Sequence, residues 1–164
     1  MGDWTGTVPT YAAGDEVKAS NMQIETAIET AVSDVWTTWT PTLTNLTATT
    51  ATQVAKYRRV GKTVDFIWSF VLGASSAVGT SPSFTLPAAP STDWAISGDT
   101  LFPMMVRVID AGVGHYDGEA RLSGSTVTLF YKSSVSAISN ITATTPMTWA
   151  TGDALSVNGT YYTA

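Results

Sequence analysis

Two alternating segments on either side of one glycine decide the fold class of this chain. Residues 53–72 read QVAKYRRVGKTVDFIWSFVL, with Gly61 between the two segments. A type II′ hairpin turn requires glycine at its first central position, where φ is positive. In the second arm every other residue is apolar, so the pleat turns Phe66, Trp68 and Phe70 to one face. These residues predict a hairpin at the centre of an antiparallel sheet, with the three rings in the core.

The rest of the chain also predicts β-strands, and the second arm carries apolar residues on its other face as well. Ile67 and Val71 point away from the predicted core, so we expect them to meet solvent or a neighbouring chain. Further strands are expected at residues 83–86, 101–109, 147–149 and 154–162, and a second hairpin joins 115–122 to 126–131. Residues 73–82 are small and predict a loop. Roughly eight strands at 8–12-residue spacing predict a mainly β fold, an antiparallel β-sandwich or jelly roll.

Composition excludes several classes of protein. The chain has 164 residues, of which 44% are apolar and only 13% charged, and it has no cysteine. Disulfides and thiolate metal sites are therefore excluded. Eight basic residues and a net charge of −5 predict no nucleic-acid partner. No run of 18 apolar residues is present, so we expect no membrane insertion.

The first 35 residues lack the strand pattern of the rest of the chain. Ser20 and Gln23 form a capping-box pattern that predicts one short N-terminal helix over residues 20–35. Such a helix is marginal alone, so it packs either on its own β domain or on copies of itself around a symmetry axis. We therefore divide the chain into an arm and helix, residues 1–35, and a β-sandwich domain, residues 36–164. The residues expected at the oligomer interface form one apolar stripe: Ile24, Ile28, Ala31 and Val35.

Residues 1–14 form an arm without any regular period. It carries Trp4, Val8, Pro9 and Tyr11 between glycines. Apolar and aromatic side chains in an irregular segment favour docking into another protein, with ordering on binding. The alternative is that the arm wraps around its own oligomer and pins the helix.

One cluster of polar residues is the strongest candidate for a catalytic or metal-binding site. His115, Asp117 and Glu119 would share one face of a strand, close to Asp110. An imidazole and two carboxylates suit a hard metal ion or acid–base catalysis. The same two-residue spacing is typical of a solvated face, and no nucleophile elbow, P-loop or zinc-protease motif accompanies it. We therefore expect no catalytic residues, no metal, no cofactor and no enzymatic activity.

The six tryptophans divide into two groups. Trp68 and Trp149 stand among apolar neighbours, which predicts core positions. The other four lie in less regular segments, where aromatic side chains favour an interface with another chain or stacking on sugars; they are Trp4, Trp36, Trp39 and Trp94.

Several stretches are similar to one group of viral proteins. Residues 8–22, VPTYAAGDEVKASNM, resemble the N-terminal element of many tailed-phage virion proteins. Residues 57–70, YRRVGKTVDFIWSF, and the later FTLP at 84–87 are similar to a hairpin and turn of tail-fibre, minor-tail and head-fibre β domains. The ending VNGTYY, residues 157–162, fits the same pattern. Lys18 replaces the threonine usual in the first element.

The resemblance implies a structural or adhesion protein of the virion, made in the host cytoplasm and displayed on the particle surface. It implies a homotrimer whose N-terminal segment attaches to other virion proteins, of capsid or tail, while the β domain projects outward. Capsid decoration, head fibre and small tail appendage all fit this description. The alternative is a carbohydrate-binding module of a tail fibre that recognises a host cell-surface glycan.

Overall fold

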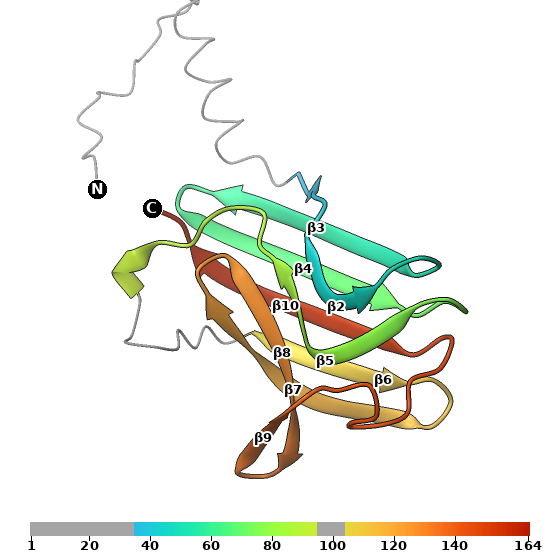
Figure 1. Ribbon diagram of the computed structural model, residues 1–164. Helices are drawn as coiled ribbons and strands as arrows, with labels where there is room; N and C mark the ends of the chain where they lie inside the picture. The colour runs from blue at the N-terminus through green and yellow to red at the C-terminus, as the bar shows by residue number, and fades with distance from the viewer. Residues whose placement is uncertain (1–34, 95–103) are drawn as a thin grey trace, which may run out of the picture. The chain divides into compact units, whose positions relative to one another are not determined.

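The computed structural model describes residues 35–94 and 104–164, which belong to one compact unit (Figure 1). These residues are mainly antiparallel β, as predicted. The helix expected over residues 20–35 lies outside the described residues except for Val35. The described elements are β1 (Thr37–Thr38), β2 (Leu43–Thr47), β3 (Thr52–Val60), β4 (Thr63–Val71), β5 (Ala77–Thr85), the 3₁₀ turn η1 (Thr92–Trp94), β6 (Met105–Asp110), β7 (Gly114–Ser123), β8 (Thr126–Ser134), β9 (Ala137–Asn140) and β10 (Ala154–Tyr162).

The strands form one curled sheet in the order β1-β3-β4-β10-β6-β7-β8-β5-β2, with β9 paired to β8. Every pairing between these strands is antiparallel. The last strand, β10, lies between β4 and β6 (Figure 1). The predicted central place of the β3–β4 hairpin is therefore wrong, because only the two-residue β1 lies beyond β3.

Each of the two predicted hairpin turns contains a glycine with positive φ. Val60 pairs with Thr63, and Gly61 between them has a φ of 59°. The second predicted hairpin closes in the same way, with Ser123 opposite Thr126 and Gly124 at a φ of 55°. A side chain at either glycine would be strained by the positive φ. Both predicted hairpins are confirmed.

The core lies on one face of this sheet. Residues in register across neighbouring strands are Ala55, Trp68, Val157 and Val106, and all four are buried. The rings predicted to face the core are buried as well: Phe66, Trp68 and Phe70. Trp68 stacks on Phe84 of β5 with ring centroids 4.5 Å apart. The alternation of β4 therefore predicted its buried face correctly.

One segment, residues 36–47, bridges the two ends of the sheet. It contains β1 and β2, which lie at opposite ends of the strand order. Between them, the Trp39 amide donates to the Ala55 carbonyl of β3 at 3.1 Å, and its indole Nε1 donates to the Thr85 carbonyl of β5 at 3.2 Å. The Trp39 ring also packs edge-on against Tyr57 and Phe66. The prediction that Trp39 faces another chain is wrong, because Trp39 packs within its own domain and bonds to strands at both ends of the sheet.

The loop predicted at residues 73–82 is largely strand β5. Ser81 has a φ of 54°, and Asn45 of β2, whose side-chain amide donates to the Thr80 carbonyl at 2.6 Å, has one of 56°. The register between β2 and β5 shifts at this point, which is where a sheet tolerates Pro82 without an amide hydrogen. The strand expected at residues 147–149 is wrong, and β9 was not predicted; its four residues pair with the end of β8.

Candidate functional site

The face of the sheet opposite the core is the candidate site, and we call it the outer face. One row of paired residues crosses it from strand to strand: Lys56, Ile67, Asn158, Met105, Glu119 and Phe130. Because side chains alternate along each strand, residues two positions from these share the face. The outer face thus extends over β3, β4, β10, β6, β7 and β8.

Exposed apolar side chains gather on the β3–β6 part of this face. Val54 is 43% exposed, Ile67 40% and Met105 59%. Val60 and Tyr162, also exposed, share the face toward the β3–β4 turn. The remaining exposed large hydrophobic residues of the described part of the chain precede β1 or lie in turns: Val35, Trp36, Val113 and Val135.

Charged side chains surround the apolar ones. Asp65 accepts from Arg58 Nε at 3.0 Å and from the Thr160 hydroxyl at 2.6 Å. The face has more cations than anions. Its cations are Lys56, Arg58, Arg107, Arg121 and Lys132; its anions are Asp65, Asp117 and Glu119.

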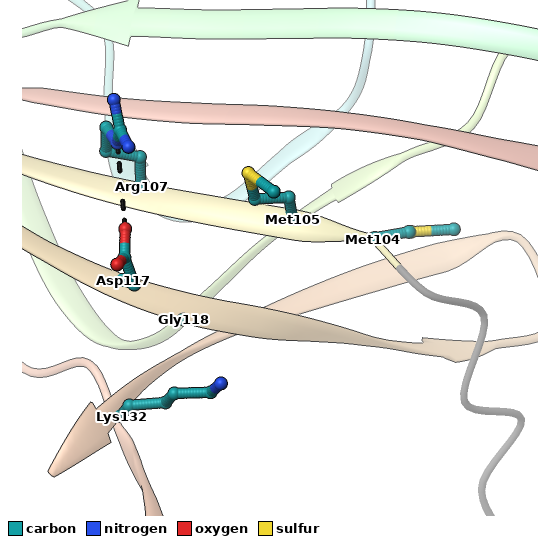
Figure 2. Close-up of a pocket in the computed structure, with 6 residues that line it drawn as sticks. All are labelled: Met104, Met105, Arg107, Asp117, Gly118 and Lys132. Carbon is teal, nitrogen blue, oxygen red and sulfur yellow. Dashed lines mark ion pairs between the residues drawn. The ribbon is translucent and has the colours of Figure 1, made fainter. Parts of the chain in front are cut away.

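A shallow hollow of about 380 Å³ lies at β6, β7 and β8 (Figure 2). Its lining residues are Met104, Met105, Arg107, Asp117, Gly118 and Lys132. Arg107 Nε and the Asp117 carboxylate are 3.7 Å apart, and both side chains are more than half exposed. Figure 2 shows Asp117 turned toward Arg107, with Lys132 on the other side of β7. Such an exposed, long pair contributes little to stability, so its groups are available to a ligand.

The predicted polar cluster does not form a metal site. His115, Asp117 and Glu119 do lie on the same face of β7, and each faces a different residue of β6: Ile109, Arg107 and Met105. Within residues 35–94 and 104–164, no three His, Asp or Glu side chains come close enough to hold a metal ion. The arrangement suits a solvated sheet face that carries charges of both signs.

The four residues predicted for particle attachment lie outside the described residues: Trp4, Val8, Pro9 and Tyr11. Three of the four residues predicted at the oligomer interface lie outside them as well: Ile24, Ile28 and Ala31. Val35, the last residue of the predicted stripe, is exposed in this chain.

The tryptophans after residue 35 differ in their surroundings. Trp36 is partly exposed, and the Arg58 guanidinium lies 5.5 Å from its ring centroid. Trp149 packs against the core cluster, as predicted, and donates to the Thr142 carbonyl at 2.8 Å. The side chain of Trp94 lies outside the described part.

The sequence indicated only part of the outer face. The alternation of β4 predicted that Ile67 points away from the core. Val54 lies in the first arm of the same predicted hairpin, and the turn at Gly61 places it near Ile67 on this face. Met105 lies 38 positions further along the chain than Ile67 and joins the face only because β10 pairs with both β4 and β6. No local signal in the sequence connects Met105 with Ile67.

Comparison with known proteins adds no relative. No protein-family model matches the chain, and neither curated proteins nor solved structures give a match. Among the described residues, no helix has the length and apolar character needed to cross a membrane.

Proposed function

We propose that this chain is a non-enzymatic structural protein of a tailed-phage virion, displayed on the particle surface and anchored by residues 1–14. The observation that carries the proposal is the resemblance of residues 57–70 and 157–162 to virion β domains. In the structure these two segments are neighbours, because β10 pairs with β4 along nine residues. The resemblance therefore covers one continuous three-stranded part of the sheet, although its pieces lie about 90 residues apart in the sequence.

The finer features of the proposal follow the same resemblance. A sandwich or jelly-roll class for the β domain is part of this proposal, and so is a homotrimer carried by the particle. The stripe of Ile24, Ile28, Ala31 and Val35 buries its apolar area between three parallel helices. Light scattering of the purified chain tests the trimer: three times 17.3 kDa supports it, and a stable monomer in dilute buffer contradicts it.

Attachment is tested separately from assembly. Replacing Trp4 and Tyr11 with alanine should weaken binding to particles that lack this protein, while the melting temperature of the oligomer stays the same. A chain that starts at Ser20 should likewise lose particle binding. Unchanged decoration by this truncated chain would show that the arm is not the anchor and that the β domain attaches itself.

The second candidate function is recognition of a host glycan, and the hollow beside Asp117 favours it. Arg107, Asp117 and Lys132 place donors and an acceptor around the apolar Met105, which is the mixture that small-ligand sites use. Binding of the isolated protein to a glycan array, lost in Lys132→Ala, would support this function. The absence of any glycan binding leaves the structural role as the proposal.

A further inference from the structure

We propose that two neighbouring hollows on the outer face, which share Lys132, form a single binding site for an oligosaccharide without net charge. This rests on glycan recognition, the second candidate function, and narrows it to one class of glycan. It also adds a second hollow to the one beside Asp117.

The second hollow lies at the β8–β9 hairpin. It has a volume of about 330 Å³ and is lined by Glu119 of β7, by Lys132 and Ser134 of β8, and by residues 135–138. Lys132 also lines the first hollow, together with Arg107 and Asp117 (Figure 2). A ligand bound to Lys132 in one hollow therefore reaches the other when it is long enough.

The charges that line the two hollows balance. The cations are Arg107 and Lys132, and the anions are Asp117 and Glu119. Arg107 of β6 lies in register with Asp117 of β7, and their charged groups are 3.7 Å apart. Positive and negative groups thus stand side by side, and the lining as a whole is neutral.

The other ionisable residues nearby on the outer face line neither hollow. The Arg121 guanidinium lies over an aromatic ring of β8, 4.8 Å from its centroid. Arg58 donates to Asp65, and Lys56 lies on β3, separated from β7 by three strands. His115 lies at the opposite end of β7 from Arg121. The excess of cations on the outer face therefore lies outside this site.

A balanced set of charges selects a ligand without net charge. The carboxylates of an acidic sugar would lie close to Asp117 and Glu119, and the ammonium group of a basic sugar would lie close to Arg107 and Lys132. Like charges at such contacts cost free energy. A sugar hydroxyl donates to a carboxylate and accepts from a guanidinium or ammonium group, so it suits both signs. A small zwitterion would match one pair of opposite charges and leave the other hollow empty.

The second hollow adds hydroxyl groups to the site. The Ser133 hydroxyl donates to the Ala137 carbonyl at 3.3 Å and accepts from the Ser139 hydroxyl at 2.9 Å. These bonds hold the two arms of the β8–β9 hairpin together. Ser134 and Ser136 line the hollow and are exposed, so their hydroxyls are available to a ligand.

Each hollow also contains an apolar side chain beside its polar groups. Met105 lines the first hollow and Ile138 the second. A sugar ring carries carbon–hydrogen groups between its hydroxyls, so it contacts both kinds of side chain. Apolar walls with a few polar groups that fix the orientation are typical of small-ligand sites.

The test begins with the purified full chain on an array of neutral, acidic and basic oligosaccharides. We expect binding to neutral members only. The disaccharide and tetrasaccharide of the best-bound neutral glycan are then compared by isothermal titration calorimetry. The tetrasaccharide should bind about tenfold more tightly or better, because only the longer ligand occupies both hollows.

Variants locate the site. Lys132→Ala should weaken tetrasaccharide binding by about tenfold or more, since Lys132 serves both hollows. Lys62→Ala is the matched control, because Lys62 is an exposed lysine in the β3–β4 turn and should leave binding unchanged. Replacing Ser134 and Ser136 together with alanine should weaken binding by about fivefold or more. An unchanged melting temperature confirms that each variant is folded.

A charge variant tests the selection against acidic sugars. Asp117→Asn combined with Glu119→Gln keeps the shape of both side chains and makes the lining positive. This double variant should bind acidic oligosaccharides that the natural protein does not bind. A double variant that still rejects them would contradict the role of the two carboxylates.

The possible failures are distinguishable. Absence of binding to every glycan on the array would remove glycan recognition and this site with it. Preference for acidic or basic glycans, or binding unchanged in Lys132→Ala or in the double serine variant, would overturn the neutral two-hollow site and leave glycan recognition standing. Equal affinity for the disaccharide and the tetrasaccharide would overturn the joining of the two hollows.

Discussion

The hydroxyl of Tyr161 makes two hydrogen bonds with the backbone of Ala88, 73 positions earlier in the chain. It donates to the Ala88 carbonyl at 3.0 Å and accepts from the Ala88 amide at 3.2 Å. Its ring is fully buried, 6.0 Å from Phe66. One side chain thus ties the end of β10 to the segment that leaves β5.

The burial of this hydroxyl makes the stability of the domain depend on pH in the alkaline range. Burial raises the pKa of Tyr161 from 10.0 to about 12. Below pH 10 both the folded and unfolded states hold the proton, so the full stability is present. Between pH 10 and 12 only the unfolded state releases it, so folding free energy is lost at up to about 1.4 kcal/mol per pH unit.

Tyr161→Phe isolates that effect. Near pH 7 the variant should lose about 1–2 kcal/mol with the two hydrogen bonds. The difference from the natural protein should shrink between pH 10 and 12, as measured by urea denaturation at each pH. Tyr162→Phe, at a partly exposed position, is the control. A difference that stays constant up to pH 12 would contradict the predicted linkage.

Trp68→Ala should destabilise the domain by about 3–5 kcal/mol, because it leaves a cavity between Phe70 and Phe84. Ile67→Ala changes the neighbouring residue on the opposite face and should cost less than about 1 kcal/mol. Denaturant unfolding followed by circular dichroism measures both. Equal losses would show that the two faces of β4 are buried alike.

Gly118→Ala should destabilise the β7–β8 pair. A Cβ at this position would collide with the backbone carbonyl of Phe130, and overpacking against a rigid group costs about 1–3 kcal/mol. Gly114→Ala is the matched control in the same strand, because nothing lies within 4 Å of its Cβ. A melting temperature unchanged in Gly118→Ala would mean that β7 and β8 can separate freely there.

Asp153→Ala should cost about 2–4 kcal/mol, since the buried carboxylate accepts from the Ala111 amide at 2.9 Å and the Ala150 amide at 2.7 Å. The substitution leaves both amides without that acceptor. Asp153→Asn keeps one oxygen and should lose less. Asp117→Ala removes an exposed carboxylate and serves as the control. A loss in Asp153→Ala no greater than in Asp117→Ala would contradict the prediction.

Local patterns in the sequence were sufficient for the hairpins and their faces. The pleat has a period of two, so the alternation around Phe66, Trp68 and Phe70 fixes which side is buried wherever the strand lies. Glycine at positions 61 and 124 fixes the turns, because positive φ is strained for other residues. The strand at 154–162 was predicted with the same bounds that the structure shows.

Local patterns failed where pairing with a distant strand overrides them. Small residues and Pro82 read as a loop, yet β2 and β8 supply the hydrogen bonds that make residues 77–85 a strand. Trp39 read as an interface residue, yet the two ends of the sheet meet around it.

The sequence by itself determined the β class, the two hairpin turns and the inward face of β4, since each depends only on residues a few positions apart. The tertiary structure decided the order of the strands, the place of β10 between β4 and β6, and the bridge over residues 36–47. It also decided the candidate site, because Ile67 and Met105 lie in one row only when β10 pairs with both β4 and β6, which places Asn158 between them. The physical reason is that strand pairing satisfies backbone hydrogen bonds between any two suitable strands. Only the packing of the whole core selects which strands become neighbours.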